Sequence, residues 1–129
     1  MKFFVDNNLS HRVASALHCL VQPTHSVVHL RERFPTDTPD VKWMNALAKE
    51  TGWVILSGDM AISRNPHEVE AWKRAGHPIF FFKYAWVQQV FWEQASRLFH
   101  LFPEILKRAA KARTGDSFMV PFKGKIEGP

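Results

Sequence analysis

Cysteine, tyrosine and long hydrophobic runs are all scarce in this chain of 129 residues. Its single cysteine, Cys19, excludes an intrachain disulfide framework and fits a reducing compartment. No apolar run approaches the roughly 18 residues of a membrane-spanning helix. Three apolar residues after Lys2 are interrupted by Asp6, so no secretory signal is expected. We therefore expect a cytoplasmic protein that spans no membrane, in which Cys19 is a small buried apolar residue.

The remaining composition is that of a globular protein. Hydrophobic residues make up 46% of the chain and charged residues 22%. The length suits one domain with a sizeable core. Lys and Arg number 17 against 12 Asp and Glu, giving a formal net charge of +5. This excess is a weak indication of a polyanionic or acidic partner.

Short apolar segments alternate with amphipathic segments along the chain. The apolar segments predict strands at residues 1–5, 26–30, 53–57, 78–82 and 117–122, the last at a sheet edge because Pro121 lacks a donor. Helical spacing predicts helices at residues 9–20, 41–50, 66–75, 86–102 and 103–113. We expect Asn7 or Asn8 to cap the first helix, Thr38 to cap the second, and Pro103 to end or kink the fourth.

This alternation favours an α/β fold with a mostly parallel central sheet between layers of helices. We expect a single domain over residues 1–122, with aromatic-rich C-terminal helices, and a loose tail at residues 123–129.

Acidic residues follow three of the predicted strands. Asp6 ends the first strand, Asp40 starts the helix after the second, and Asp59 follows the third. Because sites in parallel sheets form at the carboxyl ends of the strands, we expect these side chains to converge. Taken singly, each has an ordinary structural interpretation as a helix cap, a helix-dipole partner or a turn residue.

Three converging carboxylates repel one another unless a cation lies among them. Oxygen ligands favour Mg²⁺ or Mn²⁺ over zinc. Such an ion can activate water and stabilise charge on a phosphodiester. In such a protein the acids would hold the metal, and the surrounding Lys and Arg residues would bind the phosphate backbone of the substrate. The sequence thus predicts a metal site that acts on nucleic acid.

Three short motifs resemble those of PIN-like domains: Phe3-Phe4-Val5-Asp6-Asn7-Asn8-Leu9, Thr38-Pro39-Asp40 and Trp53-Val54-Ile55-Leu56-Ser57-Gly58-Asp59. The resemblance covers residues 1–83, and more loosely the C-terminal helices. It is strongest to the small PIN-like (VapC-type) toxins of bacterial toxin–antitoxin pairs. This resemblance implies a three-layer PIN-like fold and a Mg²⁺- or Mn²⁺-dependent ribonuclease that is the toxin of such a pair.

The resemblance also implies roles for individual residues. Asp6, Asp40 and Asp59 would hold the metal and form the catalytic centre, and Ser57 and Asn7 would support it. Many relatives carry another acid soon after the position of Asp59. Here no acid occurs before Glu68, and Asn65 and Glu68 are the candidates to replace it.

The absent acid motivates an alternative, a PIN-like module that binds RNA or protein with little or no cleavage. A phosphoryl-transfer domain fits less well. A haloacid-type phosphatase needs a second Asp where this chain has Asn8, and a receiver needs paired acids before its phosphoacceptor.

Candidate RNA contacts are Arg31 and Arg33, in the loop before Asp40, and Arg64, shortly after Asp59. The adjacent Phe91 and Trp92 place apolar groups on more than one face of a predicted helix. They are either core residues or an interface with a second subunit or an antitoxin. We therefore expect RNA, an antitoxin protein and a second copy of the chain as partners.

Overall fold

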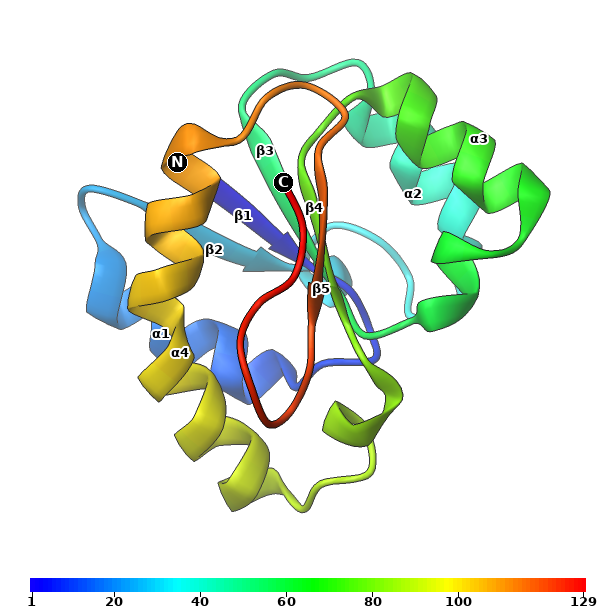
Figure 1. The fold of residues 1–129 in the computed structure, drawn as a ribbon. Helices are drawn as coiled ribbons and strands as arrows, with labels where there is room; N and C mark the ends of the chain where they lie inside the picture. The colour runs from blue at the N-terminus through cyan, green and yellow to red at the C-terminus, as the bar shows by residue number, and fades with distance from the viewer.

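A five-stranded parallel sheet forms the centre of the computed structural model, which describes residues 1–129 (Figure 1). The strands are β1 (Lys2–Val5), β2 (Ser26–His29), β3 (Trp53–Ser57), β4 (Ile79–Phe82) and β5 (Ser117–Val120). Their order is β2-β1-β3-β4-β5, and every neighbouring pair is parallel. The carboxyl ends of β1 and β3 therefore lie side by side, which brings the segments after Val5 and Ser57 together.

Four α-helices cover the two faces of this sheet. α1 (His11–Val21) and α4 (Phe91–Lys111) pack on one face, and α2 (Asp40–Leu47) and α3 (Pro66–Ala75) pack on the other (Figure 1). Short 3₁₀ helices lie in three of the connections: η1 (Leu30–Glu32), η2 (Met60–Ser63) and η3 (Tyr84–Trp86). The chain thus has the three-layer α/β architecture that the alternation of elements predicts.

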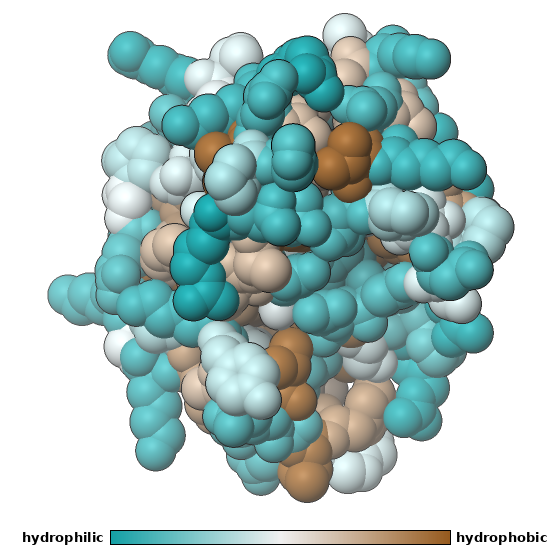
Figure 2. Space-filling view, turned by 90° about the vertical axis from the view of Figure 1, so that its right-hand side faces the viewer, coloured by the Kyte–Doolittle hydropathy of each residue, from teal (hydrophilic) through white to brown (hydrophobic).

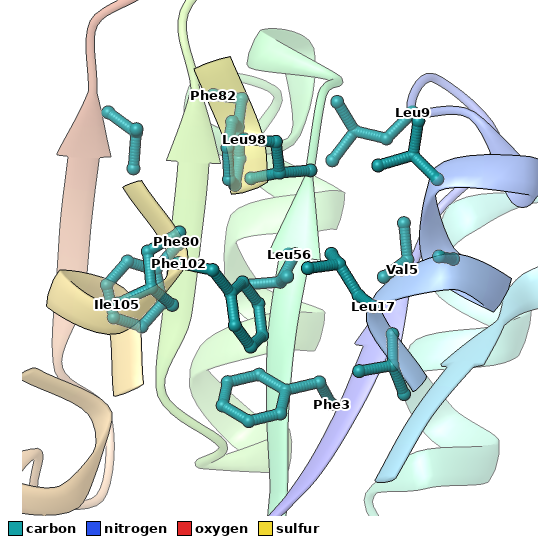
Figure 3. Packing of buried hydrophobic residues seen from close by; sticks show 14 of the residues in the cluster. Phe3, Val5, Leu9, Leu17, Leu56, Phe80, Phe82, Leu98, Phe102 and Ile105 are labelled. Atoms are coloured by element: carbon teal, nitrogen blue, oxygen red, sulfur yellow. The ribbon is translucent and has the colours of Figure 1, made fainter. Parts of the chain in front are cut away.

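Two hydrophobic clusters fill the spaces between the layers. Side chains alternate along each strand, so Phe3 and Val5 face α1 and α4 (Figure 3), whereas Phe4 faces α2 and α3. All five residues of β3 are buried. Burial on both faces explains the unbroken apolar sequence of this central strand.

The helix boundaries differ from the expected ones where local hydrogen bonds compete. Ser10, not Asn7 or Asn8, caps α1, because its hydroxyl accepts the N–H groups of Arg12 and Val13. Thr38 does not cap α2, since its hydroxyl donates to the Pro35 carbonyl at 2.6 Å. α4 continues through Pro103 as one helix of 21 residues.

Two further expectations are corrected by the packing. The tail is not loose: Met119 and Glu127 form an antiparallel bridge, and Ile126 is buried against the core. The expectation of a buried Cys19 is wrong, because this residue lies on the exposed side of α1. None of the helices combines the length and the apolar character needed to span a bilayer.

The surface on the side of α2 and α3 is mainly hydrophilic (Figure 2). Hydrophobic side chains appear there in small groups, the lowest of them over the connection between η3 and α4. Tyr84, Val90 and Trp92, which belong to this region of the chain, are 66%, 70% and 77% exposed.

Candidate metal centre

Asp6 is a buried carboxylate at the end of β1. Its N–H donates to the Leu56 carbonyl, so the residue extends the pairing of β1 with β3. Its Oδ1 accepts the N–H groups of Asn8 and Gly58, each at 3.1 Å, and its Oδ2 accepts the Ser57 hydroxyl. Burial raises the pKa of Asp6 to about 6, although these three hydrogen bonds oppose the increase.

Ser57 connects two of the expected acids. Its hydroxyl donates to Asp6 and accepts the backbone N–H of Asp59 at 3.1 Å. The side chain therefore fixes the Asp6 carboxylate and the start of the Asp59 turn with respect to each other. The supporting role expected for Ser57 has this physical basis.

Asp40 and Asp59 lie at the starts of two different helices, α2 and η2. Asp40 is the first residue of α2, and its Oδ1 accepts the indole N–H of Trp43 at 2.9 Å. Asp59 caps η2 by accepting the N–H of Ala61 at 2.9 Å. Burial raises the pKa of Asp40 to about 7; the Trp43 hydrogen bond opposes the rise, and the carboxylates of Asp59 and Asp6 add to it.

Glu68 supplies a third carboxylate to this group. Carboxylate oxygens of Asp40, Asp59 and Glu68 all lie within 4.8 Å of one another. Oε2 of Glu68 is buried and has no hydrogen-bond partner. Burial, with the charge of Asp59, raises the pKa of Glu68.

Of the two candidates for the missing acid, the structure therefore brings Glu68 to the cluster. Asn65 instead caps α3 by accepting the N–H of His67 at 3.1 Å. Asp6 lies beside the cluster rather than within it, although its charge reaches Asp40.

The donor set fits a hard divalent cation. All donors are carboxylate oxygens, as Mg²⁺ and Mn²⁺ prefer, with none of the Cys or His ligands typical of zinc. The unpartnered oxygen of Glu68 is a buried acceptor that a cation would satisfy. The raised pKa values of Asp6, Asp40 and Glu68 express the cost of gathering negative charge without one.

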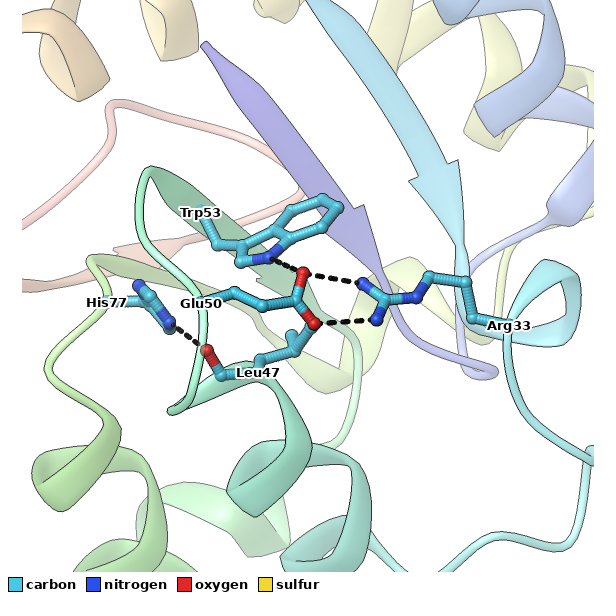
Figure 4. Close-up of polar contacts among 5 residues, drawn as sticks. All are labelled: Arg33, Leu47, Glu50, Trp53 and His77. Atoms are coloured by element: carbon cyan, nitrogen blue, oxygen red, sulfur yellow. Dashed lines mark hydrogen bonds and ion pairs between the residues drawn. The ribbon is translucent and has the colours of Figure 1, made fainter.

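The predicted RNA contacts and Asn7 form no hydrogen bond or ion pair with these acids. Arg33 forms a two-pronged ion pair with Glu50, at 2.7 and 3.1 Å, next to Trp53 at the beginning of β3 (Figure 4). Its guanidinium thus lies near the amino-terminal end of β3, whereas Ser57 is at the carboxyl-terminal end. Arg31 and Arg64 are exposed, and Asn7 is exposed and donates to the Thr36 carbonyl.

The sequence alone does not distinguish Glu68 from Asn65 as the further ligand. A usable signal was the sequence Asn65-Pro66-His67-Glu68, which puts an acid in the first turn of a helix after the Asp59 turn. That pattern is also typical of a capping box, in which the Glu side chain bonds the cap N–H. Here the Asn65 N–H donates to the Ala61 carbonyl at 2.7 Å, so the Glu68 carboxylate is not used as a cap.

Comparison with protein families agrees with this geometry. The family described as PIN like domain matches residues 1–84, the segment that holds β1 to β4 and all four acids. Neither a curated protein nor a solved structure matches the chain.

Proposed function

Since the chain belongs to the PIN-like domain family, we propose that it is a metal-dependent endoribonuclease. The observation that carries this proposal is the group formed by Asp40, Asp59 and the unpartnered Glu68 at the carboxyl end of the sheet. Mg²⁺ or Mn²⁺ held by these three acids would supply Lewis-acid chemistry for hydrolysis of an RNA phosphodiester.

The acids and their hydrogen-bond donors have different roles in this proposal. Asp40, Asp59 and Glu68 would be the ligands, and Asp6 would add negative charge from a fixed position. Oδ1 of Asp6 already accepts two hydrogen bonds, whereas Oδ2 accepts only that of Ser57, so Oδ2 keeps a lone pair with which to contact the ion or an ordered water. Trp43 holds Asp40, and Ser57 holds Asp6, so these acids need little rearrangement on binding.

We further propose that the protein is the toxin of a toxin–antitoxin pair and acts in the cytoplasm. The support is the resemblance of its motifs to small PIN-like toxins, together with the exposed Tyr84, Val90 and Trp92. Exposed aromatic and aliphatic side chains of this kind suit an antitoxin segment or a second copy of the chain.

The test is cleavage of a fluorescent single-stranded RNA with Mn²⁺ or Mg²⁺. Asp6→Asn, Asp40→Asn, Asp59→Asn and Glu68→Gln should each lower the rate by about 10–100-fold or more. Asp37→Asn, which changes an exposed acid of the loop before α2, is the matched control and should retain activity. Equal cleavage by wild type and Glu68→Gln would show that Glu68 has no role in the metal centre. Equal cleavage by wild type and Asp6→Asn would show the same for Asp6.

A second candidate function is RNA or protein binding without efficient cleavage. It is favoured by the three hydrogen bonds that Asp6 already accepts from the protein, which leave this acid less free than the others. RNA binding that persists in chelator, with no cleavage under any divalent ion, would support this candidate over the nuclease.

A further inference from the structure

A groove lined by two arginines that form no ion pair lies beside the segment that follows Asp6. It lies between the start of α1, the corner of β2 and η1, and the start of α4, and it has a volume of about 630 Å³. Asn7 and Asn8, which directly follow Asp6, line the groove, and the side-chain amide of Asn8 also donates to the carbonyl of Gly58, the residue before Asp59. We call it the Arg12–Arg31 groove.

The charge of this groove is of one sign. Arg12 and Arg31 line it, and no carboxylate is among its lining residues. By contrast, Arg33, Arg74 and Arg108 each form an ion pair with a glutamate. Arg31 instead donates to Nδ1 of His11 at 2.7 Å, and the guanidinium of Arg12 lies 4.1 Å from the ring centre of Phe91. Two cationic groups without counter-charges are suited to bind an anion.

The walls of the groove are held by hydrogen bonds within the protein. The side chain of Gln94 accepts the N–H of Ser10 at 3.2 Å and donates to the Trp86 carbonyl at 3.1 Å. Nε2 of His29 donates to the Leu9 carbonyl at 2.9 Å, and its Nδ1 accepts the N–H of Arg31 at 3.1 Å. The groove therefore exists before any ligand binds.

We propose that the Arg12–Arg31 groove binds single-stranded RNA on one side of the scissile phosphodiester, an inference that rests on the proposed nuclease function. Arg12 and Arg31 contact the phosphates, and Phe91 with the Arg12 guanidinium provides a surface on which a base stacks. Unpaired nucleotides expose the base faces that such stacking requires, whereas duplex RNA does not.

An acidic peptide is the competing occupant of a basic groove. Among the lining residues only Leu9 and Phe91 are hydrophobic, and the others are polar or basic. A groove for an amphipathic peptide helix presents a row of apolar pockets. The polar lining and the position next to the acids favour nucleic acid.

The experiment measures binding of a fluorescein-labelled single-stranded RNA of about 12 nucleotides by anisotropy, in EDTA so that no cleavage occurs. The double variant Arg12→Gln/Arg31→Gln should bind at least about tenfold more weakly, and its salt dependence should fall by about 1.4 log units per log unit of salt. Phe91→Leu, which keeps an apolar side chain, should bind about fivefold more weakly.

The matched control is Lys107→Gln/Lys111→Gln, which removes the same charge from the exposed far end of α4. Its RNA affinity should stay within about twofold of wild type. Equal losses in the two double variants would overturn the proposal, because they would show general electrostatic attraction. Unchanged RNA affinity in Arg12→Gln/Arg31→Gln would overturn it too.

Two further readouts separate this proposal from its alternatives. If Arg12→Gln/Arg31→Gln loses affinity for an oligoglutamate peptide but keeps its affinity for RNA, the groove takes acidic peptides and the proposal fails. If wild type cleaves no RNA with any divalent ion while the variants differ in RNA binding as expected, the proposed nuclease function is wrong and the RNA-binding role of the groove is supported.

Discussion

Glu68 and Asp59 bring carboxylate oxygens within 4.8 Å of each other, although one lies on α3 and the other precedes η2. The contact is set by packing, because the Trp72 indole of α3 donates to the Ile62 carbonyl of η2 at 3.2 Å. One oxygen of Glu68 is left buried and unpartnered. Such an arrangement is stable only when a proton or a cation reduces the repulsion.

Metal binding should therefore stabilise the fold through Glu68. At a Mn²⁺ concentration of about 100 times Kd, linkage adds about 2.7 kcal/mol to the unfolding free energy. For a domain of this size that raises Tm by about 5–15 °C. In Glu68→Gln the same Mn²⁺ concentration should give less than half of this shift, measured by differential scanning fluorimetry.

The matched control for this prediction is Glu70→Gln on the same helix. Glu70 is exposed and pairs with Arg74 across one turn, so its removal leaves the cluster intact. Its Mn²⁺-induced shift in Tm should equal that of wild type. A shift of the same size in Glu68→Gln would contradict a ligand role for Glu68.

The buried Asp6 should make the metal-free protein sensitive to pH. Its pKa is about 6 in the folded state against 3.8 for the unfolded chain, so the folded state binds the proton more tightly. The charged form is thus a destabilising group above pH 6, and the cost disappears as the pH falls to about 4. This difference in pKa corresponds to a cost of at most about 3 kcal/mol.

Comparison with Asp6→Asn isolates this effect. The lowered pKa values of His25 and His29 act in the opposite direction, because protonation of these side chains favours the unfolded chain as the pH falls. We expect Asp6→Asn to gain stability relative to wild type at pH 8 and to lose most of that advantage at pH 4.5, in urea titrations with chelator. An advantage independent of pH would rule out burial of the Asp6 charge as its cause.

The placement of the three aspartates at the carboxyl end of the sheet could be predicted from sequence because each follows a strand or begins a helix, although Asp6 lies beside the cluster rather than within it. Their positions depend on strand ends, which apolar runs mark clearly. The parallel pairing of β1 with β3 then places Asp6 and Asp59 at the same edge of the sheet. Glu68 could not be placed in this way. Its position depends on the docking of α3 on η2, through Trp72 and its packing against Phe81, and no local pattern encodes that contact.

The position of Arg33 also could not be predicted from local sequence. Sequence put Arg33 near Asp40 because both lie in the connection from β2 to α2. In the structure Glu50 and the ring of Trp53 hold its guanidinium at the other end of β3. Long side chains reach partners far along the chain, so proximity in sequence is a poor guide to which site they serve.

Arg33 is accordingly expected to act on stability rather than on RNA. Arg33→Lys keeps the charge but loses the two-pronged geometry, and the pair is about one-third exposed, so the unfolding free energy should fall by only about 0.5–1 kcal/mol. RNA affinity should be unchanged within about twofold. A larger loss of RNA affinity than of stability would restore Arg33 as an RNA contact.

Removal of the Ser57 hydroxyl should impair the centre without removing an acid. In Ser57→Ala, Asp6 loses a donor that lowers its pKa, and the Asp59 N–H loses its acceptor. We expect the acidic limb of the cleavage pH profile to move to higher pH, and stability to fall by about 1–2 kcal/mol. Ser63→Ala is the control, because that hydroxyl donates only to the Met60 carbonyl. An unmoved acidic limb in Ser57→Ala would contradict the coupling.

Gly58 should be intolerant of any side chain, for a reason of space. A Cβ at this position would lie 2.9 Å from Cβ of Asn8 and 3.2 Å from its carbonyl oxygen. Gly58→Ala must therefore separate the two segments that donate to Asp6. We expect a loss of about 2 kcal/mol in stability together with weaker Mn²⁺ binding by isothermal titration calorimetry.

The matched control is Gly115→Ala, in the turn before β5. Gly115 has a φ of +81°, so alanine is strained there, but nothing lies within 4 Å of the added Cβ. That substitution should cost about 1 kcal/mol of stability and leave Mn²⁺ affinity unchanged. If Gly58→Ala also binds Mn²⁺ like wild type, the close approach of Gly58 to Asn8 serves the fold alone and not the position of Asp6 in the metal centre.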